Sequence, residues 1–116
     1  MTTKAQINDT SFARAILDQP GLTAAKFTAE WCAPCHVLAP IFDAVATAHA
    51  DKAQFVEVDA DASPQASVRF GVRGLPTILF FSNGEVVSRL VGSVPRAHIE
   101  KELERLSDSV PASPPR

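Results

Sequence analysis

Cysteine is scarce in this sequence, because the 116 residues include only Cys32 and Cys35. A small secreted protein held together by disulfides carries more cysteines, spread along its chain. Two cysteines separated by two residues therefore indicate thiol chemistry rather than a disulfide scaffold. A second C-x-x-C pair, which would complete a tetrahedral zinc site, is also missing, so we expect no metal.

An excess of charge of one sign and long apolar runs are missing as well. Eleven Lys and Arg residues stand against thirteen Asp and Glu residues, giving a formal net charge of −2. That balance offers no positive surface for nucleic acid or anionic lipid. No stretch approaches the roughly 20 apolar residues that span a bilayer, and residues 1–9 lack the apolar run of a signal peptide. We therefore expect a cytoplasmic protein with no membrane segment.

The length suits a single globular domain, and 46% hydrophobic residues are enough for one core. Neither a G-x-G-x-x-G motif nor a P-loop is present, so we expect no bound nucleotide cofactor. Residues 108–116 contain three prolines. We expect a domain over residues 1–107 and a disordered tail over residues 108–116.

Hydrophobic periodicity and turn residues predict an alternation of strands and helices. Helices are expected over 11–18, from 34 for about four turns, over 64–70 and over 95–106; strands are expected over 22–29, 55–58, 77–81 and 85–91. Asn83-Gly84 marks a hairpin between the last two strands. This order indicates an α/β fold whose sheet is parallel at helical crossovers and antiparallel at the hairpin. We expect His49 and His98 to face solvent, and five phenylalanines to lie in the core: Phe27, Phe42, Phe55, Phe80 and Phe81.

The cysteine pair stands at the start of the predicted helix that follows residue 33. Its spacing places both sulfurs within bridging distance. The dipole and the unpaired N–H groups of the helix N-terminus stabilise a thiolate at Cys32 and lower the pKa of its thiol. Once Cys32 has formed a mixed disulfide, Cys35 can attack the same bond and release the reduced product. The pattern predicts reversible thiol–disulfide exchange.

The same residues, with His36, also spell C-x-x-C-H, the pattern of c-type haem attachment. We do not favour this interpretation. Attachment requires export, for which residues 1–9 offer no signal, and the only methionine is Met1.

The sequence resembles thioredoxins over nearly the whole chain, from about residue 7 to residue 106. The most specific match is Ala-Glu-Trp-Cys-Ala-Pro-Cys at 29–35, followed by Leu-Ala-Pro at 38–40; further matches are Val58-Asp59 with Asp61, Gly-Val-Arg-Gly-Leu-Pro-Thr at 71–77, Asn83-Gly84 and Val91-Gly92. The resemblance implies a thioredoxin fold, a central mixed sheet flanked by helices on both faces. It also implies a cis-proline at Pro76, facing the cysteines. The implied substrate groove consists of Trp31, Ala33, Pro34, Gly74, Leu75, Pro76 and Gly92.

Two charged residues depart from the family pattern. Most thioredoxins have a buried Asp at the position of Lys26 and a Lys at the position of Glu57, so the acid and the amine have traded places. We hypothesise that Lys26 and Glu57 pair on neighbouring strands, because either charge alone would be costly to bury. The alternative is that Lys26 extends its ammonium to the surface. Thr28 is a further departure, at a position where an aromatic residue is common.

Either member of this pair is a candidate for tuning the thiol pKa values and for accepting the proton of Cys35, and the sequence does not choose between them. A positive Lys26 nearer to the sulfurs than Glu57 would favour the thiolate. The Cys32–Cys35 couple would then be more oxidising than in a similar protein with a carboxylate at position 26.

These features predict a protein-disulfide reductase that carries electrons in cell redox homeostasis, with Cys32 as nucleophile and Cys35 as resolving thiol. The resemblance implies disulfide-containing substrate proteins and an NADPH-dependent thioredoxin reductase as partners of a monomer. Two alternatives stay open, a specialised disulfide oxidant or isomerase and a non-catalytic binding module. The sequence identifies neither the physiological substrates nor the redox potential.

Overall fold

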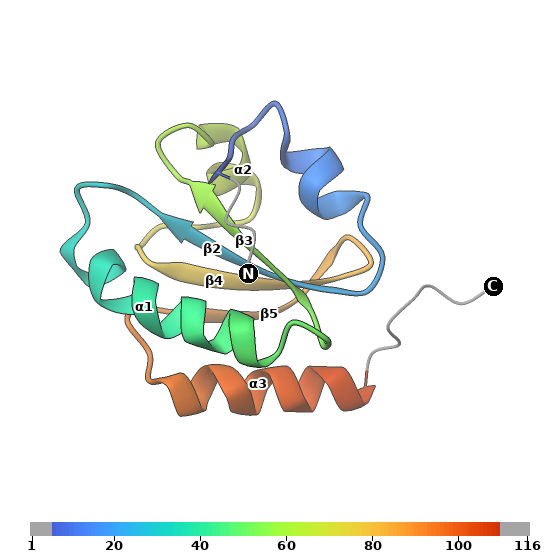
Figure 1. The fold of residues 1–116 in the computed structure, drawn as a ribbon. Helices are drawn as coiled ribbons and strands as arrows, with labels where there is room; N and C mark the ends of the chain where they lie inside the picture. The colour runs from blue at the N-terminus through green and yellow to red at the C-terminus, as the bar shows by residue number, and fades with distance from the viewer. Residues whose placement is uncertain (1–5, 110–116) are drawn as a thin grey trace.

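The computed structural model describes residues 6–109, which form a five-stranded sheet in the order β1-β3-β2-β4-β5. Helices α1 and α3 lie along one face of this sheet, and α2 and a π-helical turn, η1, lie on the other (Figure 1). The elements are β1 (Gln6–Ile7), η1 (Ala13–Leu17), β2 (Leu22–Thr28), α1 (Ala33–Ala48), β3 (Gln54–Asp59), α2 (Pro64–Arg69), β4 (Thr77–Ser82), β5 (Glu85–Val91) and α3 (Arg96–Ser109). The predicted α/β fold with helices on both faces is confirmed.

The sheet is mixed, as expected. β3 pairs in parallel with both β1 and β2, whereas β4 pairs antiparallel with β2 and β5. The β4–β5 hairpin turns at Asn83 and Gly84, with φ of 50° and 87°, as a tight two-residue turn between twisted strands requires. A Cβ on Gly84 would lie 2.3 Å from the Leu17 carbonyl oxygen, so this turn also depends on glycine for space.

Side chains that alternate along the strands form two cores, one on each face of the sheet. The first core joins Ala24 and Ile78 of the sheet to Phe42 of α1 and Leu103 of α3. The second core lies under η1 and α2 and contains a group of aromatic rings, including Phe12, Phe27, Phe70 and Phe81. The five phenylalanines predicted to be in the core are all buried.

Two segments differ from the sequence-based expectation. The two-residue strand β1 was not predicted, because a pair of residues is too short to show periodicity. Helix α3 continues through Ser109, so the predicted tail starts too early. Residues 110–116, the rest of that predicted tail, lie outside the described residues.

The short helix α2 takes its N-terminal cap from a distant segment. The side chain of Ser63, the residue before the helix, makes no capping hydrogen bond. Instead, the two carboxylate oxygens of Asp9 accept hydrogen bonds from the backbone N–H groups of Gln65 and Ala66, each at 3.0 Å. A negative charge at this position also suits the helix dipole.

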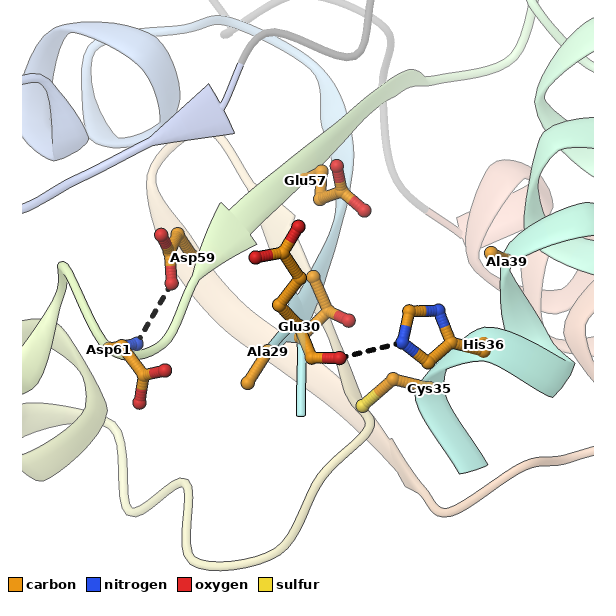
Figure 2. Close-up of a pocket in the computed structure, with 9 residues that line it drawn as sticks. Ala29, Glu30, Cys35, His36, Ala39, Glu57, Asp59 and Asp61 are labelled. Carbon is orange, nitrogen blue, oxygen red and sulfur yellow. Dashed lines mark hydrogen bonds between the residues drawn. The ribbon is translucent and has the colours of Figure 1, made fainter. Parts of the chain in front are cut away.

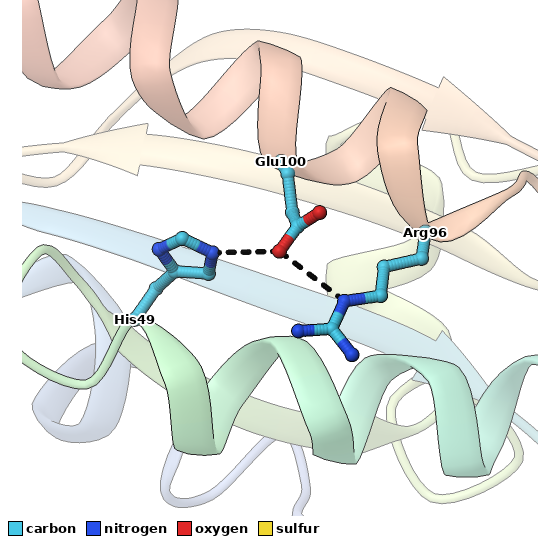
Figure 3. Close-up of polar contacts among 3 residues, drawn as sticks. All are labelled: His49, Arg96 and Glu100. Atoms are coloured by element: carbon cyan, nitrogen blue, oxygen red, sulfur yellow. Dashed lines mark hydrogen bonds and ion pairs between the residues drawn. The ribbon is translucent and has the colours of Figure 1, made fainter.

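His49 corrects another expectation, because it is half-buried and joins the end of α1 to α3 (Figure 3). Its Nε2 donates to a carboxylate oxygen of Glu100 at 2.9 Å, and Nε of Arg96 lies 3.2 Å from the same oxygen. These donors hold the pKa of the Glu100 carboxyl below its ordinary value. The predicted exposure is confirmed for His98.

This lowered pKa predicts a contribution of Glu100 to acid stability. A carboxyl whose pKa is lower in the folded state adds stability above its unfolded pKa and loses it as the pH falls through the folded value. The urea midpoint of Glu100→Gln should therefore fall less than that of the wild type between about pH 5 and about pH 3. Glu104→Gln, an exposed change on the same helix, is the control. Equal falls in the wild type and Glu100→Gln would contradict the prediction.

Candidate active site

The two cysteines form a disulfide at the N-terminus of α1, with their Cα atoms 5.3 Å apart. Cys32 is the N-cap residue, in extended conformation, and its Sγ accepts a hydrogen bond from the backbone N–H of Cys35 at 3.2 Å. Pro34 occupies the first turn, where a helix needs no intrahelical N–H donor. Both cysteines are buried, with exposed fractions of 4% for Cys32 and 1% for Cys35. The helix N-terminus therefore directs N–H groups and positive dipole at the Cys32 sulfur.

The loop before β4 lies against this disulfide. Leu75 packs on the small cluster formed by Ala29 and the two cysteines. The peptide bond between Leu75 and Pro76 is cis, which confirms the conformation implied by the resemblance. The Pro76 carbonyl oxygen accepts a hydrogen bond from the Gly92 N–H at 2.8 Å, so the segment after β5 supports this loop.

The predicted groove residues come from three segments of the chain, and one of them, Leu75, packs on the cysteine cluster. Trp31 is 70% exposed, and its indole N–H donates to a carboxylate oxygen of Asp61 at 2.8 Å. This bond ties the indole ring to the segment that follows β3 and leaves most of the ring open to solvent. Ala33, Pro34 and Gly74 are also exposed, whereas Pro76 is buried. A contact between these residues and a substrate stays a prediction.

Lys26 and Glu57 lie side by side on β2 and β3, as hypothesised. The Lys26 Nζ is 3.2 Å from a carboxylate oxygen of Glu57 and 5.2 Å from the centre of the Phe42 ring in α1. Lys26 has no exposed surface, so its extension to solvent is excluded. Within the described residues, the Lys26 Nζ has no hydrogen-bond partner, so its contact with Glu57 is an ion pair and not an aligned hydrogen bond. The side chain of Glu57 is 20% exposed.

A pocket of about 260 Å³ opens beside Cys35 and exposes the Glu57 carboxylate (Figure 2). Its lining comes from the end of β2, the first turns of α1 and the end of β3: Thr28, Ala29, Glu30, Cys35, His36, Ala39, Glu57, Asp59 and Asp61. The Nε2 of His36 donates to the Glu30 carbonyl oxygen at 2.7 Å and ties the helix to the loop before Cys32. Cys35 and Glu57 therefore share one space that is large enough for water.

This pocket was not predicted from the sequence. Asp59 and Asp61 were noted only as matches to the family, with no role in a pocket. The hydrogen bond from His36 to Glu30 involves a loop, and hydrophobic periodicity gives no information about loops. Thr28 was the available signal, because the aromatic side chain common at its position is larger and would occupy part of this space.

Within residues 6–109, no three or more His, Cys, Asp and Glu side chains are placed to hold a metal ion. No helix in the same range is long and apolar enough to cross a membrane.

Comparison with known proteins gives consistent matches. A family model described as Thioredoxin matches residues 3–105. The chain is 34% identical over 105 residues to thioredoxin 1 of Nostoc sp., covering 90% of this chain and 98% of that protein. It is 35% identical over 99 residues to the thioredoxin of Rhodospirillum rubrum, covering 85% of this chain and 95% of that protein. It is also 34% identical over 99 residues to the chloroplastic M-type thioredoxin of Pisum sativum, with 85% of this chain and 58% of that protein covered.

The ion pair predicts an unequal cost for the removal of its two members. Glu57→Gln leaves the fully buried Lys26 ammonium without an anion and should lower the free energy of unfolding by about 3–5 kcal/mol. Lys26→Met leaves a carboxylate that still reaches solvent, so the loss should be smaller. Combining both substitutions should recover much of the loss from Glu57→Gln. Urea unfolding at neutral pH measures all three variants, and losses that simply add would show that the charges do not interact.

Proposed function

The chain belongs to the thioredoxin family, and from that membership we propose how this thiol–disulfide oxidoreductase uses its residues to reduce disulfides in partner proteins. The observation that carries the proposal is the position of Cys32 at the N-terminus of α1, where its Sγ accepts the Cys35 N–H. In the reduced protein the same N–H groups and dipole favour the Cys32 thiolate. The likeness to thioredoxins does not favour the alternatives of an oxidant, an isomerase or a binding module.

The proposed reaction has two exchange steps. The Cys32 thiolate attacks one sulfur of a substrate disulfide, forms a mixed disulfide and releases the other substrate sulfur as a thiolate. Cys35 then loses its proton and attacks the Cys32 sulfur, which releases the second substrate thiolate. The two substrate thiolates take up protons. Two electrons pass to the substrate, and the protein is left with the Cys32–Cys35 disulfide.

We assign the proton acceptor for Cys35 to Glu57 rather than to Lys26. Glu57 lines the pocket that Cys35 also lines, and its carboxylate reaches solvent there. Each water molecule takes about 30 Å³ in the liquid, so this pocket has room for water that relays the proton. Lys26 has no exposed surface and directs its ammonium at Glu57 and Phe42, so it acts as a positioning residue that holds the carboxylate. A more oxidising couple, expected if Lys26 lies nearer to the sulfurs than Glu57, stays a prediction.

The groove that we propose for the substrate consists of Trp31, Ala33, Pro34, Gly74, Leu75, Pro76 and Gly92. Its support is the packing of Leu75 on the cysteine cluster and the exposure of the Trp31 ring. Electrons would return to the disulfide from an NADPH-dependent flavoprotein reductase, and the cytoplasm is the location that we propose. The support for the reductase is the family to which the chain belongs. The relatives described above include a chloroplastic protein, so the compartment needs its own test by fractionation.

The reductase function predicts rapid reduction of insulin disulfides with dithiothreitol as electron donor, an assay that needs no other enzyme. The wild type should exceed the rate of dithiothreitol alone, and Cys32→Ser should return the rate to that background. Precipitation of the insulin B chain measures the reaction. A wild-type rate equal to the background would contradict the function.

The assignment of Glu57 predicts a slower second step. In Glu57→Gln the mixed disulfide should accumulate, and its decay should speed up with rising pH because hydroxide or buffer must take the Cys35 proton. Acid quenching followed by mass spectrometry measures the mixed disulfide. Glu30→Gln removes a different carboxylate from the pocket and is the control.

Stability and chemistry can be separated with the double variant Lys26→Met and Glu57→Gln, which carries no unpaired buried charge. This variant should fold more stably than Glu57→Gln and still accumulate the mixed disulfide. A normal second step in the double variant would contradict the role of Glu57.

A further inference from the structure

The loop of residues 70–76 connects α2 to β4 and carries one side of the proposed groove. Its far end is held by two hydrogen bonds. The Thr77 hydroxyl donates to the Gly74 carbonyl oxygen at 2.7 Å, and the Gly92 N–H donates to the Pro76 carbonyl oxygen at 2.8 Å. Its near end follows α2, which stops after Arg69. The backbone N–H groups of Gly71 and Val72 donate there to carbonyl oxygens of the last turn of α2, at 3.2 and 2.8 Å.

Arg89 of β5 adds a side-chain anchor from a distant part of the chain. Its guanidinium donates to the Phe70 carbonyl oxygen at 2.6 Å and to the Gly71 carbonyl oxygen at 3.3 Å. Both carbonyls follow the last turn of α2, where acceptors lack intrahelical donors and a positive charge is favoured. Gly71 has a φ of +67°, and a Cβ there would lie 3.9 Å from Nη2 of Arg89. The guanidinium therefore lies along the backbone at the start of the loop.

We propose that Arg89 is a positioning residue for the substrate groove, which holds the start of the 70–76 loop so that Leu75 and Pro76 keep their place beside the disulfide. Gly92 directly follows β5 and holds the other end of the same loop. Residues in and directly after β5 thus hold both ends of this loop. This inference rests on the proposed reductase function and adds a residue that touches neither the cysteines nor the predicted groove surface.

The hydrogen bonds of Arg89 lie in a different part of the fold from the hydrogen bond to the Cys32 sulfur. The hydrogen bond from Cys35 N–H to Cys32 Sγ lies within the start of α1, and the bonds of Arg89 lie at the end of α2. Loss of Arg89 should therefore weaken the docking of a protein substrate while leaving the reactivity of the Cys32 thiolate unchanged. A small disulfide makes few contacts with the loop and should not sense the change.

The test compares Arg89→Leu, Arg89→Lys and the wild type in steady-state reduction of insulin. Arg89→Leu should raise KM by about five- to tenfold with kcat within about twofold, and Arg89→Lys, which keeps a donor, should fall between it and the wild type. Reduction of a small aromatic disulfide should keep its wild-type rate in both variants. Arg14→Leu, which removes an exposed arginine on η1, is the matched control and should behave as the wild type.

Hydrogen exchange of the oxidised protein tests the anchor without any enzymatic activity. The amides of residues 71–75 should exchange faster in Arg89→Leu than in Arg14→Leu, and unchanged exchange would overturn the anchor. Faster exchange with an unchanged KM, or a parallel loss of small-disulfide reduction, would overturn the role in the groove. Failure of the wild type itself to reduce insulin would instead overturn the reductase function, while the exchange result would still judge the anchor.

Discussion

The buried ammonium of Lys26 must be neutralised where it lies, and the carboxylate 3.2 Å away on Glu57 is the anion in reach. An unpaired charge in the core costs several kcal/mol, so the parallel register that sets β2 beside β3 is under electrostatic as well as hydrophobic constraint. The Phe42 ring of α1 closes over the same ammonium. Since α1 begins at the disulfide, this ion pair connects the centre of the sheet to the helix that carries the chemistry.

The positions of Lys26 and Glu57 also decide which of the two side chains lines the pocket beside Cys35. The lysine is sealed between the sheet and α1, whereas the carboxylate lies at the pocket edge together with Cys35. In the proposed mechanism, an acid on β3 therefore takes the part that the family usually gives to an acid on β2. The small side chain of Thr28 helps to keep this space open, so the exchange of charges and the pocket act together.

The disulfide depends on elements from distant parts of the chain. The start of α1 supplies both cysteines, and Leu75 of the loop before β4 packs against them. Arg89 and Gly92, in and directly after β5, donate hydrogen bonds to the two ends of this loop. The C-x-x-C pair, the hairpin and the alternation of strands and helices were readable from the sequence because each is a local pattern. The anchor at Arg89 and the cap from Asp9 were not readable, since each joins residues whose separation in sequence carries no periodic signal.

The sequence by itself determined the fold class, the hairpin at Asn83-Gly84 and the redox pair, because these follow from short-range spacing, turn preference and hydrophobic period. It also suggested that Lys26 pairs with Glu57, because the sequence resembles a family in which the two charges are reversed. Only the tertiary structure decided that the pair forms and that the acid rather than the amine opens to the pocket. Burial and solvent access depend on how α1 covers the sheet, and that packing is a property of the whole chain rather than of any segment.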